Sequence, residues 1–584
     1  MKQKKVDAVI VGLGWAGSIA AKELADAGLS VVVLERGSVR TQAETFDTPR
    51  LYDELPYSIR NRLAMDLSRE TITFRNNSQQ TALPMRQFGS FNPSSGTGGS
   101  GVTWSGHTFR ALPSDFVLRS HISERYGADF VPEHMTIQDW GVTYDELEPH
   151  YDKFERVAGT SGKAGNLNGQ IQSGGNPFEG VRSHEYPNPP FPSAVAGKLF
   201  TDATELMGYT PFPVPVSNSS QSYTNPYGIQ LNECRVCGHC AGFGCTYNSK
   251  ASAITTVVPA LVNNPQVELR HNAYVTKVNL SEGKQATGVT YIDAMGRQIE
   301  QPADLVILAA YAYNNVRLML LSDIGTPYNP QTGEGTIGRN YAYQRLTNVI
   351  GFFDDKNFNP YVAGGGTATA IDDFNGDNFD HSSLGFIGGG FIGSFSTNGL
   401  PIANHPTPPD APRWGSGWKQ AVVDSYQSTT SLNIHAACQS YRGNYLDLDP
   451  TYKDAWGLPL LRMTFDFDQN EHKMSEFLTD RAVEIMQEMG ARQIQEIRRQ
   501  GSYDITQYQT THNVGGAVMG EDPSTSAVNR YLQSWDVSNL FVMGSSAFPQ
   551  NTGYNPTDTL GALVYHSLEA IKNKYLKNPG ALVG

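Results

Sequence analysis

Four closely spaced cysteines carry the most concentrated chemical signal in this chain. Cys234, Cys237, Cys240 and Cys245 form a C-x2-C-x2-C-x4-C run, while Cys438 stands alone. Neighbouring thiolates are ligands for a soft metal centre. The first part of the run has the spacing with which a short loop wraps an iron–sulfur cluster, whereas structural zinc usually joins two distant CxxC pairs. The run therefore favours an iron–sulfur cluster, with zinc and with free or disulfide-bonded thiols as alternatives.

Glycines and an acid near the N-terminus have the spacing of a dinucleotide site. Gly12, Gly14 and Gly17 form a GxGxxG, and Glu35 follows 18 residues after the last glycine. In such a site the glycines permit a tight turn, close approach of the backbone to a pyrophosphate, and close packing of helix on strand. The acid accepts hydrogen bonds from ribose hydroxyls. The motif predicts FAD or NAD and does not separate the two.

The segments around this motif predict the elements that must position it. Residues 6–11 (VDAVIV) are apolar almost throughout, as in a parallel strand covered on both faces. Residues 18–27 contain good helix formers and precede Gly28, which is a helix stop. Residues 30–34 (SVVVL) predict a second buried strand. The order strand, turn, helix, strand, acid makes the motif more specific than an isolated GxGxxG.

A second glycine-rich segment, 96–107, reads GTGGSGVTWSGH. A loop of this kind lets the backbone approach a bulky planar ligand; a flexible surface loop is the alternative.

Near the C-terminus, four short motifs follow one another in order: His512, Met519-Gly520, Gly544-Ser545-Ser546 and Asn555-Pro556. A neutral imidazole can accept a hydroxyl proton, because its unperturbed pKa is about 6.5. For His512 the alternative is a structural histidine in a loop, and for Asn555 it is an ordinary turn asparagine before proline.

These motifs, in this order, resemble the glucose–methanol–choline (GMC) oxidoreductase family. Its members have the N-terminal GxGxxG, a glycine-rich flavin loop near residue 100, and a late histidine followed by His or Asn before Pro. Residues 305–325 resemble the family's central strand–helix segment. Within the family, residues 57–73, 136–152 and 444–466 resemble the large flavoprotein subunits of bacterial gluconate, sorbitol and 2-ketogluconate dehydrogenases.

The resemblance implies that FAD is the cofactor and that an alcohol is oxidised. His512 is then the general base, Asn555 hydrogen-bonds to the same substrate oxygen, and hydride passes to flavin N5. The implied flavin contacts beyond the first motif are Gly98, Gly99, Ser100, Trp104, Ser545 and Ser546. Two positions depart from the family: Trp104 stands where members have Asn, and Gly544 where they have Asp. We expect the binding mode to be kept, with altered contacts at these two positions.

Length and composition bound the remaining possibilities. The chain has 584 residues, more than one core usually supports, so two or more domains are expected. Its net charge is −13 and it has no long basic run, which argues against nucleic-acid binding. No apolar stretch reaches about 18 residues, the length that spans a bilayer. The first residues resemble the start of a signal peptide, but the glycines from Gly12 onward favour a strand entering a turn.

The expected fold is α/β, with a discontinuous FAD-binding domain of Rossmann type and a sheet-based α+β substrate domain, as the resemblance implies. The expected FAD-binding segments are 1–110, 225–345 (with the cysteine run) and 505–584, and the substrate-binding segments are 111–224 and 346–504. Residues 363–369, rich in glycine, and 401–412, rich in proline, predict surface loops.

The resemblance also implies a substrate and partners. D-gluconate is the preferred substrate among sugar acids and polyols, while sorbitol, 2-ketogluconate and glucose stay open. Electrons would leave through a 3Fe-4S cluster, for which three of the four cysteines suffice, to a cytochrome c subunit. A small chaperone-like subunit would carry the chain to the periplasm, where the partners hold it at the membrane; without partners the expected location is cytoplasmic. The alternatives are an oxygen-using oxidase, which needs no cluster, and an electron-transfer or binding protein with a vestigial flavin site.

Overall fold

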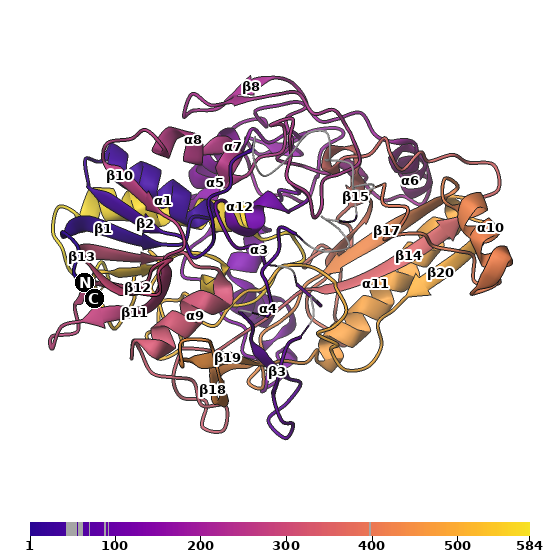
Figure 1. Ribbon diagram of the computed structural model, residues 1–584. Coiled ribbons are helices and arrows are strands. Elements are labelled where there is room, and N and C mark those ends of the chain that lie inside the picture. The colour runs from indigo at the N-terminus through magenta and orange to yellow at the C-terminus, as the bar shows by residue number, and fades with distance from the viewer. Residues whose placement is uncertain are drawn as a thin grey trace.

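The computed structural model describes residues 1–42, 55, 62–68, 70–86, 89–91, 93–395 and 399–583. Two large sheets dominate it, and Figure 1 shows one at the left and the other at the right. The left-hand sheet has seven strands. In spatial order they are β10 (Val267–Arg270), β2 (Val31–Leu34), β1 (Val6–Val11), β13 (Gln298–Leu308), β12 (Ala286–Ile292) and β11 (Tyr274–Leu280), with β21 (Leu540–Val542) also paired to β13.

The strands at the centre of this sheet are parallel. β1 pairs in parallel with β2 and β13, and β21 pairs in parallel with β13. β1 and β2 are apolar along nearly their whole length because helices and loops cover both faces. The helices around the sheet are α1 (Trp15–Asp26), α5 (Tyr144–Ala158), α9 (Ala312–Leu321) and α12 (Thr557–Ala570). α12 packs on α1 and α5, and α9 packs against β11 (Figure 1).

The right-hand sheet has six strands, and all its pairings are antiparallel. In spatial order they are β20 (Gln493–Ile497), β14 (Arg345–Phe352), β17 (Thr429–Ala436), β16 (Gly390–Ser394), β15 (Thr369–Ile371) and β7 (Phe212–Pro213). The long helix α11 (Gln469–Glu488) packs on β14 and β17, and α6 (Val195–Leu206) packs on β15 (Figure 1). α10 (Gly415–Ser425) is exposed along most of its length.

Smaller elements complete the chain. A four-stranded sheet contains β18 (Tyr445–Lys453), β19 (Pro459–Thr464), β3 (Thr73–Arg75) and β4 (Leu83–Pro84). Two short hairpins pair β5 (Asn166–Leu167) with β6 (Gln170–Ile171), and β8 (Tyr223–Thr224) with β9 (Gln230–Leu231). In the described part of the chain the remaining short α-helices are α3 (Pro113–Phe116), α4 (Leu118–Tyr126), α7 (Ala253–Thr256) and α8 (Val258–Leu261). None of the helices in the described part of the chain is both long and apolar enough to cross a membrane.

The α/β architecture predicted from the sequence is confirmed. The domain segments remain a prediction, and the packing departs from them in two places. β18 and β19 lie in the predicted substrate segment, yet β19 pairs with β3, and Leu446 and Met463 join the core of the seven-stranded sheet. α5 joins the same core through its contact with α12. Both departures arise from long-range contacts that sequence patterns do not contain.

The glycine-rich segment 363–369 is buried, so the prediction of a surface loop there is wrong. Its backbone lies against neighbouring chain: a Cβ on Gly366 would fall 2.1 Å from the ring of Phe191, and one on Gly365 would fall 2.6 Å from the carbonyl oxygen of Ser105. The glycines are there for close packing rather than for flexibility. The proline-rich residues 401–412 are exposed or half-buried, as predicted.

Candidate active site

A cavity of about 410 Å³ lies between the two large sheets. Its walls include Val11, Leu34 and Met543, which stand at or just after the carboxyl ends of β1, β2 and β21. β14 and β17 of the six-stranded sheet close the other side. In open α/β sheets, ligands bind outside the carboxyl ends of the parallel strands. The cavity is therefore where a dinucleotide cofactor would meet its substrate.

The N-terminal glycines shape one wall of the cavity. Gly12 has a φ of +103°, and a Cβ on it would lie 2.4 Å from the carbonyl oxygen of Ala309. A Cβ on Gly17 would lie 1.9 Å from the carbonyl oxygen of Gly12, so this position requires glycine for helix–strand packing. The amide of Gly98 donates to the carbonyl of Leu13 at 2.8 Å and joins the two glycine-rich loops.

The first turn of α1 is ready to receive an anion. Gly14 is its N-cap residue, no side chain caps the helix, and the first turn contains no acid. The N–H groups and the positive end of the helix dipole thus face the cavity without a competing carboxylate. Gly14 and Gly99 both line the cavity, and a Cβ on Gly99 would contact the Cα of Gly14 at 3.5 Å.

Glu35 lies where the sequence places a ribose-binding acid, at the end of β2 and in the cavity wall. Its carboxylate accepts hydrogen bonds from the backbone amides of Leu13 at 2.9 Å, Gly37 at 2.8 Å and Gly96 at 3.1 Å. These contacts hold the side chain in one orientation, and a carboxylate with about four acceptor sites can still accept from a ligand hydroxyl.

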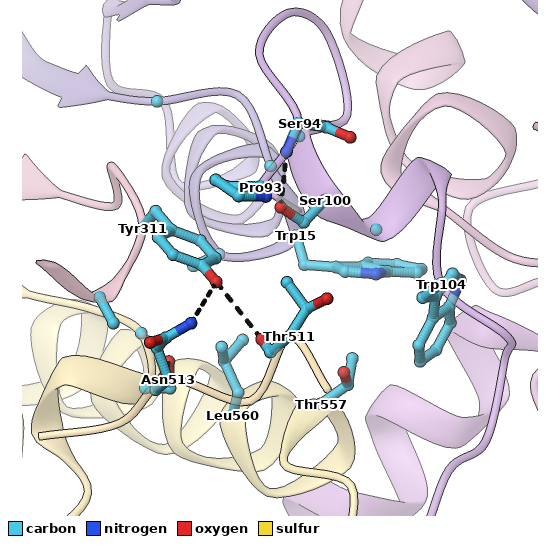
Figure 2. Close-up of a pocket in the computed structure, with 18 of the residues that line it drawn as sticks. Trp15, Pro93, Ser94, Ser100, Trp104, Tyr311, Thr511, Asn513, Thr557 and Leu560 are labelled. Atoms are coloured by element: carbon cyan, nitrogen blue, oxygen red, sulfur yellow. Dashed lines mark hydrogen bonds between the residues drawn. The ribbon is translucent and has the colours of Figure 1, made fainter. Parts of the chain in front are cut away.

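Aromatic side chains stand around the middle of the cavity, as Figure 2 shows. Trp15 and Trp104 meet edge to face, with ring centroids 5.9 Å apart. Across the cavity, the hydroxyl of Tyr311 donates to the carbonyl of Thr511 at 3.3 Å and accepts from Nδ2 of Asn513 at 3.0 Å (Figure 2). Flat walls of this kind suit a planar ring system.

The three predicted serines have different places. Ser100 lines the cavity and its hydroxyl accepts from the amide of Ser94 at 3.0 Å. Ser545 also lines it and donates to the carbonyl of Asn513 at 2.8 Å. Ser546 is fully buried and is not part of the cavity lining; its hydroxyl accepts from Nδ2 of Asn315 at 3.1 Å.

His512 and Asn555 lie side by side in the cavity wall, with Nε2 of the histidine 3.2 Å from Nδ2 of the asparagine. On the other side of the ring, Nδ1 of His512 is 2.6 Å from Oε1 of Gln344. The amide nitrogen of Gln344 donates to the carbonyls of Gly553 at 3.4 Å and Tyr554 at 3.2 Å. Because those carbonyls require the –NH2, the amide oxygen faces His512. Nδ1 therefore carries the hydrogen, and Nε2 presents a lone pair to the cavity.

Electrostatics keep His512 uncharged. Burial lowers the pKa of His512 to about 3, and His107 nearby adds to the effect. In this structure the Nε2 lone pair accepts from Nδ2 of Asn555, and in a neutral imidazole the same lone pair can accept a proton from a substrate hydroxyl. Oδ1 of Asn555 is buried without a hydrogen-bond partner, which leaves one open acceptor beside this base.

Several cavity residues were not predicted from the sequence. Asn433 and His435 project from β17 into the cavity, two residues apart on one face, while Leu432, Ile434 and Ala436 are buried on the other. The polar–apolar alternation of 429–436 is the signal that could have indicated them. Tyr311 stands three residues after the carboxyl end of β13, another position that favours ligand contacts. Gln344, which contacts His512 from outside the cavity lining, has no such local signal.

The four clustered cysteines line one small pocket and form no disulfide. Backbone amides point at their sulfurs: Val236 N lies 3.4 Å from Cys234 Sγ, and the amides of Ser249 and Lys250 lie 3.4 Å from Cys245 Sγ. N–H···S contacts of this kind help set the potential of iron–sulfur centres. Within the described residues, no group of three His, Cys, Asp or Glu side chains is arranged to hold a single metal ion. The thiolate donor set fits a cluster in its chemistry, and the cluster remains a prediction.

The cysteine-rich loop packs directly on the loop that lines the cavity. The ammonium of Lys250 is buried and donates to the carbonyls of Trp104 at 2.5 Å and Cys240 at 2.7 Å. The amide of Gly242 donates to the carbonyl of Thr103 at 2.7 Å. The cysteines predicted to bind the cluster and the glycine-rich loop predicted to contact the flavin therefore lie on adjoining loops. His239 hydrogen-bonds through Nδ1 to the carbonyl of Cys237 at 2.7 Å.

Comparisons with known proteins agree with this geometry. Two GMC oxidoreductase family descriptions match residues 221–345 and 440–563. The chain is 51% identical to the gluconate 2-dehydrogenase flavoprotein of Pantoea cypripedii, over 99% of this chain and 95% of the relative. It is 25% identical to the fructose dehydrogenase large subunit of Gluconobacter japonicus, over 97% of this chain and 98% of the relative.

Solved structures share the fold at low sequence identity. Pyridoxine 4-oxidase from Mesorbium loti superposes with a TM-score of 0.60 at 16% identity, covering 98% of this chain and 100% of that one. Formate oxidase superposes with a TM-score of 0.59 at 13% identity, covering 99% and 100%. With the near-full-length relative at 51% identity, these findings establish that the chain belongs to the GMC oxidoreductase family, whose members are flavoenzymes.

Proposed function

We propose that this chain is an FAD-dependent dehydrogenase that oxidises a secondary hydroxyl of a sugar acid, with D-gluconate to 2-dehydro-D-gluconate as the preferred reaction. The observation that carries the proposal is the pairing of His512 with Asn555 in the cavity beside the N-terminal glycine motif. The choice of gluconate rests on the relative at 51% identity, which is a gluconate 2-dehydrogenase flavoprotein.

The residues proposed to hold FAD surround the cavity. The uncapped first turn of α1 receives the pyrophosphate, and Glu35 accepts from the ribose. The proposed set is Gly12, Gly14, Gly17, Glu35, Gly98, Gly99, Ser100, Trp104, Ser545 and Ser546; Gly17 and Ser546 act from behind the cavity wall. When bound, FAD supplies the hydride acceptor for alcohol oxidation.

The side chains of this protein handle the proton and the geometry. Nε2 of His512 accepts the proton of the substrate hydroxyl while a hydride leaves the carbon that bears this hydroxyl. The alcohol thereby loses two electrons and two hydrogens and becomes a ketone. Asn555 hydrogen-bonds to the substrate oxygen and fixes the direction of the C–H bond. Gln344 holds His512 in the tautomer that this step requires.

We propose that Cys234, Cys237, Cys240 and Cys245 provide the ligands of an iron–sulfur cluster of the 3Fe-4S type, with one cysteine spare. The contact of this loop with the cavity loop through Lys250 supports a short path for electrons. A cytochrome c subunit is the proposed acceptor. A small chaperone-like subunit and a periplasmic location, with membrane association through the partners, complete the proposal.

Product analysis tests the substrate. The FAD-loaded protein is incubated with an artificial electron acceptor and one candidate at a time: D-gluconate, D-sorbitol, 2-keto-D-gluconate or D-glucose. The proposal predicts 2-dehydro-D-gluconate from gluconate, with the highest kcat/KM of the four. Turnover of only another candidate would keep the reaction class and overturn the substrate. Hydrogen peroxide formed with oxygen as sole acceptor, at the same rate, would favour an oxidase.

A further inference from the structure

Three imidazoles share one end of the cavity. His107, His435 and His512 all line it, and the rings of His435 and His512 have centroids 6.2 Å apart. The ring of Phe395 contacts both His107 and His435. Its centroid is 4.7 Å from that of His107 and 6.1 Å from that of His435. Only His512 has a role in the proposed reaction, so the other two need an explanation.

His107 has an unused polar atom. The side chain is 5% exposed, and its Nε2 has no hydrogen-bond partner. The other ring nitrogen, Nδ1, lies 2.9 Å from the hydroxyl of Ser105, which can donate to it and leave the hydrogen on Nε2. A buried donor without a partner costs free energy, so a ligand that supplies an acceptor there binds more tightly.

His435 is oriented in a similar way. Its Nδ1 lies 3.2 Å from Oε1 of Gln344, the same oxygen that accepts from His512. Its ring stacks on Phe391, with centroids 4.8 Å apart. Nε2 of His435 is the nitrogen left for the ligand, and it becomes a donor when the ring takes up a proton.

The charged residues of the cavity lie elsewhere. Among the lining residues that the structure describes, the only ionised side chains of Asp, Glu, Lys or Arg type are Glu35, Arg36 and Arg317. Arg36 pairs with Glu70 at 2.8 Å, and Arg317 pairs with Asp454 at 2.7 Å. Both arginines stand with Glu35 at the dinucleotide end. Besides the three histidines, Tyr508 is the titratable residue of the lining near the substrate end.

Substrate chemistry places an anion at the histidine end. In a 2-hydroxy sugar acid, the carboxylate carbon is bonded directly to the carbon that loses hydride. When His512 contacts the reacting hydroxyl, the carboxylate must therefore lie within a few ångströms of the same imidazole. The described neighbours that can meet it are imidazoles and amides rather than lysine or arginine.

We propose that His107 and His435 form the subsite for the carboxylate of the substrate, and that a sugar acid binds together with one proton that this pair takes up. The inference rests on the proposed function and adds the residues that distinguish a sugar acid from a neutral polyol. His512 stays unprotonated, because its Nδ1–H is held by Gln344 and its Nε2 serves the reacting hydroxyl.

The resting state of the pair agrees with this role. Burial lowers the pKa of His107 to about 4, although the Gly365 carbonyl, which lies near the ring without forming a well-aligned hydrogen bond, opposes the shift, and burial lowers the pKa of His435 well below its usual range. Both rings are thus neutral before substrate arrives. An adjacent carboxylate favours the charged imidazole, and three mutually repelling imidazoles make uptake of more than one proton unfavourable.

Rapid mixing of the FAD-loaded protein under anaerobic conditions tests the subsite. The dissociation constant of D-gluconate and the limiting rate of flavin reduction are measured from pH 5 to pH 9, with D-sorbitol as the neutral comparison. The wild type is compared with His107→Gln and His435→Gln, and with His134→Gln as a matched control at an exposed histidine. Bound FAD and thermal stability verify that each variant folds.

Uptake of one proton predicts that gluconate binding weakens up to about tenfold per pH unit on the alkaline side. His107→Gln is expected to raise the gluconate dissociation constant at least about tenfold, and to lower the limiting rate by a smaller factor, while His134→Gln leaves both values at the wild-type level. Calorimetry of gluconate binding to the dithionite-reduced holoenzyme, in two buffers of different ionisation enthalpy, should give about one proton bound.

Gluconate binding that is independent of pH and equal in wild type and both variants would overturn the subsite, while flavin reduction by gluconate would still support the proposed function. Wild-type protein whose flavin is reduced by D-sorbitol but not by gluconate would overturn the proposed substrate, and the subsite with it.

Discussion

Oε1 of Gln344 lies 2.6 Å from Nδ1 of His512 and 3.2 Å from Nδ1 of His435. One amide oxygen thus orients both imidazoles. Its own orientation is set by the carbonyls of Gly553 and Tyr554, which stand just before Asn555. The proposed base, its tautomer and its asparagine neighbour are therefore one connected unit, and the first prediction concerns the residue at its centre.

Replacing Gln344 by alanine should lower the rate of flavin reduction by about ten- to a hundredfold, by analogy with the loss of a residue that orients a metal-bound imidazole. Bound FAD should be unchanged, since Gln344 is not part of the proposed FAD set. Single-turnover absorbance gives the rate. Gln172→Ala, at a half-buried residue outside the cavity lining, is the control. A Gln344→Ala rate equal to that of the control would show that the tautomer needs no such partner.

Replacing His512 by alanine should keep FAD bound and slow flavin reduction by at least about a hundredfold, because the hydroxyl proton loses its acceptor. The FAD absorbance of the purified variant and its single-turnover rate check the two parts separately. Near-normal reduction in a variant that holds a full complement of FAD would exclude His512 as the base.

The pH profile with a neutral polyol should be flat over an unusual range. The pKa of His512 is lowered to about 3, so the active neutral form persists above that value and is lost only as the pH falls through it. The limiting rate of flavin reduction should therefore stay constant from pH 8 down to about pH 5, whereas an ordinary histidine would lose half its activity near pH 6.5. A midpoint near 6.5 in stopped-flow data would contradict the buried environment assigned to this ring.

A buried ion-pair network away from the cavity predicts a stability effect. Glu155 accepts from Nε of Arg110 at 2.8 Å and from Nη2 of Arg182 at 2.5 Å. Burial opposes ionisation, yet the two arginines hold the pKa of Glu155 at about 2. Because this pKa lies below that of an unfolded glutamate, the stabilisation is present above about pH 4.5 and is lost as the pH falls through about 2.

Glu155→Gln should lower the free energy of unfolding by about 3–5 kcal/mol, since it removes the carboxylate that two buried guanidinium groups share and leaves each with one longer ion pair, Arg110 with Glu148 at 3.1 Å and Arg182 with Glu179 at 3.8 Å. Urea denaturation at pH 7 measures the loss. Glu268→Gln removes an exposed partner of Arg270 and should change stability by about 1 kcal/mol or less. Equal effects of the two substitutions would mean that the buried network adds nothing beyond an exposed pair.

Iron and acid-labile sulfide analysis tests the cysteine run. The proposal predicts both elements in the purified wild type and their loss when Cys237 and Cys240 are both replaced by serine, because fewer than three of the four cysteines then remain, while Cys438→Ser, at a buried cysteine outside the run, keeps them. The flavin spectrum should be present in both variants. Zinc without sulfide in the wild type would refute the cluster.

The sequence predicted correctly those features that depend on residues close together in the chain. Residues 6–11 and 30–34 predict β1 and β2 to within one residue, because apolar runs and the glycine turn lie within one short segment. The place of Glu35 in the cavity wall was also predicted, because it follows the same short segment. A helix beginning at 18 proved to begin at Trp15, since the first turn contains the last glycine of the motif.

The places of His107 and His435 at the substrate end of the cavity depend on long-range pairing and were not predicted. His435 reaches His512 only because β17 pairs with β14, which starts one residue after Gln344. His107 joins them through Phe395, which follows β16. The buried segment 363–369 was wrongly predicted as a surface loop for a related reason. Its glycines allow close packing against Phe191 and Ser105, which are distant in sequence. Composition alone cannot distinguish close packing from flexibility.

The most direct test of the central claim is an anaerobic absorbance titration of the FAD-loaded chain with D-gluconate. The account predicts that gluconate bleaches the flavin bands in the wild type to completion, and that His512→Ala shows the same initial flavin spectrum but bleaches far more slowly. A protein that shows no flavin spectrum after addition of FAD, or whose flavin is not reduced by gluconate or by any of the polyols tested, would contradict it.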